Sequence, residues 1–381
     1  MILLVVYMAL LIPFFKPSLV TESAMLSLIY NIAQVIVSVF VIFDYIKKKK
    51  FSHNILIIIF MEAILFISSL MNGLDMIDII KNIIQTVILC MLIEDLAKKN
   101  IKILFKALKL IFNILLFINF IFVIKYPFGI RVGLYNSWLL GAKNAQIMYI
   151  LPAIFCTYID GFIVNMRNKK SIVEFLFVLF ISSYTLYVVQ SSTSIIVLLI
   201  FTLLMIMSNS KFYAQIGMKF ITMLYIIVFL FVIVFQSQTF FSTWLFDLFG
   251  KDATFTGRTK IWERSIEYIK EKPYLGYGLE PSEIRIIKMN NISALNCHNM
   301  LLEILYDGGI ILFIIFSVFW IRLCGYVDDF SKKNNQILKS VIIAYLIELL
   351  TEVFVFEVLL WIFVLIIAIS QKEEGINNVE K

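Results

Sequence analysis

Long apolar stretches follow one another along almost the whole chain and are separated by short polar segments. Windows of about 20 apolar residues are typical of transmembrane helices, and their recurrence predicts about twelve spans. They lie at roughly 1–15, 23–45, 53–72, 77–96, 103–124, 143–163, 171–189, 193–209, 217–236, 300–322, 337–351 and 354–370. One long span that contains a break is the alternative interpretation of the last two.

The composition supports the same class of protein. Of 381 residues, 61% are hydrophobic, and the mean hydropathy is +0.94, well above that of soluble domains. The first stretch, "MILLVVYMALLIPFF", lacks the basic start and small-residue cleavage site of a signal peptide, so we interpret it as a membrane helix. The sequence therefore predicts an all-α, polytopic integral membrane protein with one large external loop between roughly 237 and 299.

Lysine and arginine alternate between the short loops. One set of loops holds the basic clusters: "KKKK" at 47–50, then Lys98, Lys99, Lys102, Arg167, Lys169, Lys170, Lys211, Lys332, Lys333, Lys339 and Lys372. Cytoplasmic loops carry such an excess, so both termini are predicted to be cytoplasmic. The net charge of +7 then reflects these loops and indicates no nucleic-acid partner.

Two predicted external loops are basic, although the rule places most lysine and arginine in cytoplasmic loops. These two loops are therefore the candidates for a functional site. One is the loop at 125–142, flanked by Lys125 and Lys143 and containing Arg131. The other is 237–299, which divides the chain into nine predicted spans before it (1–236) and three spans with a cytoplasmic tail after it (300–381). Contact with lipid headgroups is the simplest alternative explanation for these charges.

Within the large loop, "TGRTKIWERSIEYIKEKP" has helical spacing. Arg258, Trp262, Ile266 and Ile269 fall on one face, which predicts a short amphipathic helix at the membrane surface. The Arg258 guanidinium could stack on the Trp262 indole and still present its fork to a phosphate. The following "PYLGYG" turn has glycines that allow close backbone approach. An ordinary surface helix and turn would show the same pattern.

A histidine and a stripe of polar residues begin the next span. The His298 imidazole is suited to accept a proton near neutral pH. Asn299, Glu303 and Asp307 repeat at intervals of four, and an intramembrane carboxylate is by default a hypothesis of function. Buried contacts that fix helix packing are the alternative, and helix pairing is the simplest interpretation of Glu348 and Glu352. Neither the cysteine spacing nor any other motif predicts a metal or a cofactor.

Taken together, these motifs resemble a known family. "GRTKIWERSIEYIKEKPYLGYG", followed by "HNMLLEILYDGG" at the start of a span, is similar to the signature of the O-antigen polymerase and ligase superfamily, and "GAKNAQ" is similar to another segment of that family. The resemblance covers about a third of the chain. It implies metal-independent transfer of a glycan from undecaprenyl pyrophosphate on the outer face of the bacterial cytoplasmic membrane, which builds a surface polysaccharide from lipid-linked repeat units. It leaves room for a chain-length regulator and a flippase as partners, besides membrane lipid.

The resemblance implies roles for individual residues. The expected catalytic residues are Arg258, which would meet the pyrophosphate, His298 as the base, and Asp307. The residues expected to bind substrate are Arg131, Lys143, Asn144, Gly257, Trp262, Gly276, Gly278, Asn299 and Glu303. Where many relatives have an arginine at the start of an earlier span, this chain reads "SSTSIIVLL", so Arg131 or Lys143 is expected to supply that charge.

Two other activities remain open at the level of the sequence. A ligase would transfer finished polymer to a different acceptor, and the motifs do not separate it from a polymerase. A flippase or exporter of lipid-linked sugars would be expected to have inverted repeats and ionisable residues near the membrane midplane. The polar residues here concentrate at the predicted outer surface, which favours an enzyme.

Overall fold

The structure is a computed structural model that describes residues 1–48, 51–132, 135–164, 169–236, 257–333, 336–354 and 356–377. The chain forms two compact units. The first unit consists of Met1–Ser52, Gln85–Ile206 and Phe356–Lys381, and the second of His53–Ile84 and Met207–Val355. Residues 237–256, about the first third of the predicted large loop, lie outside the described residues. They include Thr256, whose residue type is suited to cap the start of the polar helix.

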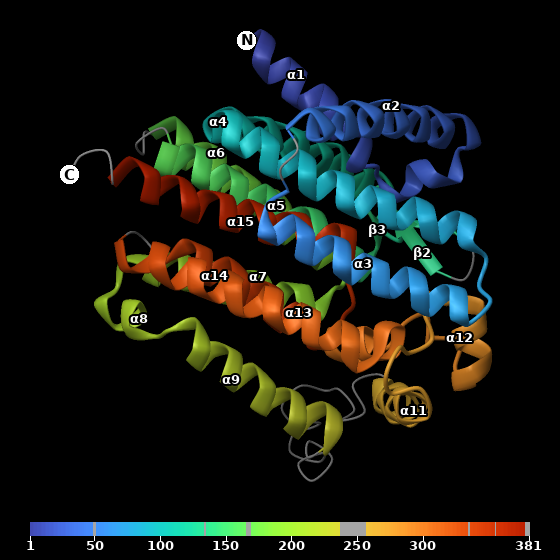
Figure 1. The fold of residues 1–381 in the computed structure, drawn as a ribbon. Helices are drawn as coiled ribbons and strands as arrows, with labels where there is room; N and C mark the ends of the chain where they lie inside the picture. Colours follow the sequence, from blue (N-terminus) through green and yellow to red (C-terminus); the bar gives the residue numbers. More distant parts are fainter. Residues whose placement is uncertain are drawn as a thin grey trace. The chain divides into compact units, whose positions relative to one another are not determined.

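The first unit is mainly helical, and α5 lies beside α6 within it (Figure 1). Its α-helices are α1 (Ile2–Leu11), α2 (Ala24–Lys48), most of α4 (Met76–Lys125), α5 (Ile147–Tyr158), α6 (Lys169–Val189), α7 (Ser192–Ile206) and α15 (Phe356–Asn377). Short 3₁₀ segments occupy Ile12–Phe14, Ser18–Glu22 and Lys143–Gln146, and a π-helical turn occupies Ile159–Val164.

The second unit carries the polar segment of interest, and its α13 lies along α3 (Figure 1). Its helices are α3 (His53–Met71), α8 (Lys211–Gln215), α9 (Met218–Phe229), α11 (Arg258–Glu271), α12 (Ser282–Met289), α13 (Met300–Lys333) and α14 (Ile337–Leu349). A 3₁₀ turn at Met207–Asn209 precedes α8, and a π-helical segment at Leu230–Val234 extends α9.

Six helices in the described part of the chain are long and apolar enough to cross a membrane. They begin at Ala24, His53, Met76, Lys169, Ser192 and Met300, and three shorter apolar helical segments accompany them. These lengths agree with the predicted polytopic membrane protein. The predicted spans 77–96 and 103–124 are two helical segments of α4 that meet at a kink. The backbone of Asn100 is non-helical at the kink, and its side chain accepts a hydrogen bond from the Ile103 amide (3.1 Å). The predicted spans 337–351 and 354–370 form two separate helices, α14 and α15.

A small β-sheet in the first unit departs from the all-α prediction. Strands β1 (Ile130–Val132), β2 (Tyr135–Trp138) and β3 (Gly141–Ala142) pair antiparallel in that order. In its register Arg131 faces Asn136 and Trp138 faces Gly141. The strands are too short to show a period of two along the sequence, which is why the sequence analysis assigned the segment to a loop.

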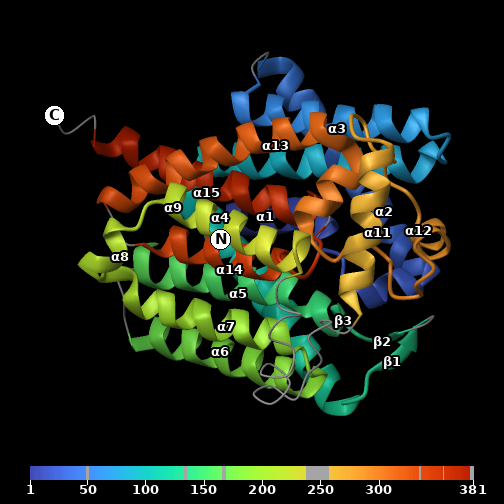
Figure 2. The same ribbon diagram turned by 90° about the horizontal axis from the view of Figure 1, so that it is seen from below.

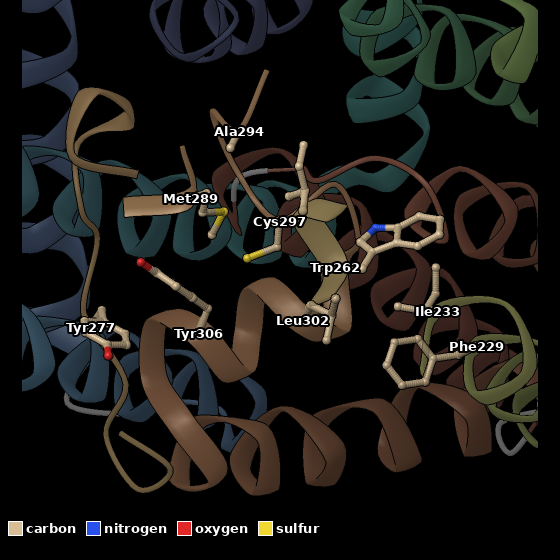
Figure 3. Packing of buried hydrophobic residues seen from close by; sticks show 10 residues of the cluster. Phe229, Ile233, Trp262, Tyr277, Met289, Ala294, Cys297, Leu302 and Tyr306 are labelled. Carbon is tan, nitrogen blue, oxygen red and sulfur yellow. The ribbon is translucent and has the colours of Figure 1, made fainter. Parts of the chain in front are cut away.

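The apolar core beneath the polar segment is formed by α11, α13 and the π-helical end of α9. Figure 3 shows Trp262, Cys297 and Leu302 packed together with Phe229 and Ile233 at one end of the cluster. At the other end Tyr277 and Tyr306 stack, with ring centroids 5.0 Å apart. Burial of this much aromatic surface fixes α11 and the turn after it against the start of α13.

Candidate active site

Helix α11 is amphipathic, as predicted, but its apolar face lies against protein. Ile261, Trp262 and Ser265 are buried, and the Trp262 indole donates a hydrogen bond to the His298 carbonyl oxygen (3.4 Å). Its solvent-exposed side chains are charged: Lys260, Glu263, Arg264, Glu267, Lys270 and Glu271. The apolar face is therefore not available to the membrane surface, because the core of the second unit already covers it.

Arg258, His298 and Glu352 come together in the second unit and form what we call the His298 cluster. The Arg258 guanidinium makes an ion pair with Glu352, which lies between α14 and α15. Glu352 Oε2 also lies 3.8 Å from Nδ1 of His298. The cluster thus joins the first residue of α11, the residue two positions before α13 and the segment after α14.

The backbone and ring contacts of His298 constrain its chemistry. Its φ of +48° lies in the left-handed region, which costs a non-glycine residue of order 1–3 kcal/mol and is concentrated at functional sites. Its Nε2 lies 2.8 Å from the Ser293 carbonyl oxygen, so in the neutral ring Nε2 carries the proton and donates it. Nδ1 is then the basic nitrogen, and it makes no hydrogen bond within the part of the chain that the structure describes.

Glu352 is well placed to stay ionised. Burial alone would raise the pKa of this carboxyl, but His298 and the Arg258 guanidinium outweigh burial and hold the pKa below its usual value. The His298 cluster therefore places an ionised carboxylate 3.8 Å from the basic nitrogen of a histidine, an arrangement that suits general acid–base catalysis.

Glu303 and Asp307 belong to a second group, the Arg285 cluster. The Arg285 guanidinium, from α12, pairs with Glu303 and, at 2.5 Å, with Asp307. Burial lowers the pKa of Arg285, but the two carboxylates more than offset this and raise the pKa well above its usual value. The guanidinium is almost completely buried, with 4% of its side chain exposed, and it also lies over the Tyr306 ring (4.9 Å).

The "PYLGYG" turn, residues 273–278, packs into a break in α13, and we call it the glycine turn. Helix α13 is interrupted at Gly309, where φ is +61°. The interruption frees the carbonyl oxygens of Tyr306 and Asp307, which accept hydrogen bonds from the amides of Tyr277 and Gly278 (both 2.8 Å). Beyond the break, the Ile310 and Ile311 amides donate to Pro273 and Tyr274 (2.8 and 3.3 Å). These four backbone groups at the break thus find partners in the turn.

The close approach expected of Gly276 and Gly278 is an approach to protein backbone. Both have positive φ, +65° and +75°. A Cβ on Gly276 would collide with the Tyr306 carbonyl, and one on Gly278 would come within 2.5 Å of Ser69 in α3. Their substrate-binding role stays a prediction, while the structure gives both glycines a packing reason.

The remaining predicted residues of the second unit fall around these clusters. The Asn299 side chain accepts a hydrogen bond from the Leu302 amide (3.0 Å) and donates one to the Leu350 carbonyl oxygen (2.9 Å). It therefore caps α13 and ties that helix to the end of α14. Gly257, with a φ of +86°, directly precedes α11. The Cys297 thiol is fully buried and burial raises its pKa, which does not suit a nucleophile.

Arg131, Lys143 and Asn144 belong to the first unit. Arg131 lies in β1 and Lys143 in the 3₁₀ turn before α5, and both side chains are exposed. The Asn144 side chain accepts a hydrogen bond from Ser191 (3.0 Å), and Ser191 also bonds to Ser194 (2.8 Å). The structure thus joins "GAKNAQ" to the serine-rich segment where relatives carry an arginine.

Two residues of these clusters were missed or undervalued by the sequence analysis. Arg285 lies in "PSEIRIIKMNN", where no motif marks it, although an arginine between apolar residues of a helix is a signal of a buried ion pair. Glu352 was noted only as a candidate for helix pairing. Its position next to Arg258 depends on contacts between segments that are distant in sequence.

The fold and site define a polytopic α-helical membrane protein with a polar site built on the segment before α13. Comparison with known proteins agrees. Residues 177–317 match a family model described as O-Antigen ligase. The O-antigen ligase of Pseudomonas aeruginosa is 32% identical over 79 residues, which cover 21% of this chain and 18% of that relative. The chain thus matches less than a fifth of the relative's length. Both findings confirm the predicted resemblance to the O-antigen polymerase and ligase superfamily and support an O-antigen-related membrane enzyme.

Proposed function

We propose that the protein polymerises lipid-linked repeat units on the outer face of the bacterial cytoplasmic membrane. The donor is a glycan on undecaprenyl pyrophosphate, and the acceptor is a sugar hydroxyl of another lipid-linked repeat unit. The observation that carries the proposal is the His298 cluster, which combines a guanidinium, a group suited to pair with phosphate, with a histidine whose Nδ1 is the basic nitrogen. The match to a ligase family supports the same transfer chemistry.

In the proposed reaction, the acceptor oxygen attacks the anomeric carbon of the donor. The bond between that carbon and the phosphate oxygen breaks, and the carrier pyrophosphate leaves with the bonding electrons. The hydroxyl proton passes to Nδ1 of His298, and a general base of this kind contributes about 10²–10⁴ in rate. Arg258 stabilises the charge that develops on the leaving pyrophosphate, as a preorganised cation does.

Glu352 has two positioning roles in this scheme. In the structure it neutralises Arg258, so an incoming pyrophosphate competes with it for the guanidinium. Once released from Arg258, the carboxylate remains beside Nδ1 of His298, where it stabilises the imidazolium. Donor binding thus favours proton transfer to His298. Asp307, predicted as catalytic, instead supports the site through its ion pair with Arg285.

A ligase is the second candidate, because both comparisons carry that description. The two activities differ only in the acceptor, so the His298 cluster serves either. They are distinguished by mass spectrometry of undecaprenyl-linked glycans and of surface polysaccharide in wild-type cells, a deletion strain and a strain that carries His298→Ala. Polymerase activity predicts single repeat units on the carrier and no long polymer in both mutant strains.

Other outcomes of this experiment contradict the polymerase. Long polymer that stays on the carrier and never reaches its final acceptor would identify a ligase. Lipid-linked repeat units that accumulate on the cytoplasmic side would identify a flippase. Wild-type polymer in the His298→Ala strain would remove the His298 cluster from the reaction.

A further inference from the structure

Apolar side chains are exposed on α12 and on the loop that follows it. Ile287 is 78% exposed and Ile292 is 61% exposed, and Ile284 and Leu295 are exposed beside them. The opposite face of α12 is buried through Arg285 and Met289. This arrangement is the reverse of the one in α11, which contacts α12 (Figure 2), because α11 buries its apolar face and exposes charges.

The segment around α12 is tied to the end of a membrane-spanning helix. The Leu279 amide donates a hydrogen bond to Ser69 of α3 (3.0 Å), and Asn72, just beyond α3, donates to the Gly276 carbonyl oxygen (3.1 Å). At this end of α3, Leu70 and Met71 are exposed. Helix α12 therefore starts a few residues from an exposed apolar end of a helix that is long and apolar enough to cross a membrane.

The other end of the segment is held in the same way. Leu295 lies five residues before α13, whose capping residue Asn299 bonds to Leu350. The basic residues of α12 are turned away from the exposed face, since Arg285 pairs with Glu303 and Asp307, and Lys288 pairs with Glu280. The exposed side chains of this segment are therefore mostly apolar. The exposed polar ones are Glu283 near its beginning, and Asn290 and Ser293 in the loop.

We propose that the exposed apolar face of α12 and the following loop (residues 284–295) inserts into the adjacent leaflet of the membrane. Apolar side chains of this size, left in water beside a bilayer, gain free energy by entering the boundary between headgroups and acyl chains. The membrane is favoured as the occupant because the segment is fixed at both ends to membrane helices. The contact holds α12 at the depth of the lipid headgroups and rests on the fold alone, so it is independent of the proposed function.

Site-specific fluorescence tests this contact. The four native cysteines are buried, so a new surface cysteine is labelled selectively. The variant Ile287→Cys is labelled with an environment-sensitive fluorophore and reconstituted in nanodiscs of phosphatidylglycerol and phosphatidylethanolamine that hold one copy of the chain. We expect blue-shifted emission and at least twofold quenching when the acyl chains of the lipids are brominated.

A matched control comes from the neighbouring helix. Glu267 of α11 has 58% of its side chain exposed, and Glu267→Cys is expected to show water-like emission and little quenching. Equal, weak quenching at both positions would overturn the proposal. Blue-shifted emission at position 287 without quenching by brominated lipid would identify a protein surface as the occupant, and emission that shifts only when two copies share a disc would identify a second copy. Either result would also overturn it.

Discussion

The second unit contains two groups of buried charge that look alike in composition and differ in design. Each joins one arginine to carboxylates from other segments. The Arg285 cluster pairs its arginine with two carboxylates, and the guanidinium is sealed among α12, α13 and the Tyr306 ring. The His298 cluster shares one carboxylate between an arginine and a strained histidine, whose side chain is 17% exposed. In the His298 cluster an arriving anion could replace Glu352 as the partner of Arg258, while Nδ1 of His298 makes no hydrogen bond within the described residues.

The comparison indicates how the site is supported. The Arg285 cluster and the glycine turn hold the first two turns of α13, and the residues just before α13 carry His298. The Arg285 cluster thus fixes the position of the His298 cluster, because residues held by buried ion pairs do not rearrange when a substrate binds. Mutations in the two clusters should therefore separate activity from stability.

The largest effects are expected on activity, in the His298 cluster. His298→Ala removes the base and should lower the transfer rate about 10²–10⁴-fold. Arg258→Ala removes the leaving-group cation and should lower it about 10²–10³-fold. The measurement is the rate at which purified protein in liposomes elongates lipid-linked repeat units, with the amount of folded protein determined by size-exclusion chromatography.

The chain offers a matched control for each change. His53→Ala alters the other histidine, and Arg264→Ala removes an exposed arginine of the same helix, α11. Both controls should keep the wild-type rate. Loss of activity in the controls, or full activity in Arg258→Ala, would contradict the assignment of activity to the His298 cluster and of stability to the Arg285 cluster.

The next effect is on stability, in the Arg285 cluster. Arg285→Met leaves two buried carboxylates without their cation, and breaking a buried ion pair in this way costs about 3–5 kcal/mol. The melting temperature of the purified protein in detergent should fall sharply. The triple variant Arg285→Met, Glu303→Gln, Asp307→Asn should recover most of it, because no buried charge is then unpaired. An inactive Arg285→Met that melts like the wild type would instead place this cluster in the reaction.

A smaller effect is expected at the glycine turn. Gly276→Ala combines a positive φ with a collision against the Tyr306 carbonyl and should cost about 3 kcal/mol or more. Gly73→Ala is the control, since its φ is also positive (+67°) but no atom lies within 4 Å of the added Cβ. It should cost only about 1 kcal/mol. Equal melting temperatures for the two variants would show that the turn does not pack into the break of α13.

The helix boundaries near the site can be predicted from the sequence, whereas the contacts between distant segments cannot, for a physical reason. The helix expected in "TGRTKIWERSIEYIKEKP" runs from Arg258 to Glu271, because its apolar spacing and the Pro273 stop are local signals. The same spacing does not reveal whether the apolar face meets lipid or protein. In the structure that face packs against the core of the second unit, and the location of α11 at the membrane surface stays a prediction. Partners such as Glu352 depend on tertiary packing, and periodicity carries no information about them.

The smallest and last effect tests the net electrostatic contribution of Glu352 to stability. The pKa of this group is lower in the folded protein than in the unfolded chain, where it is about 4.3. The stabilisation is therefore complete above that value and is lost as the pH falls through the lower folded pKa. Below pH 4, the melting temperature of the wild type should thus fall more steeply than that of Glu352→Gln, which has no charge to lose at this position. Parallel melting curves would show that Glu352 makes no net electrostatic contribution, and the carboxylate would then be no partner for either Arg258 or the His298 imidazolium.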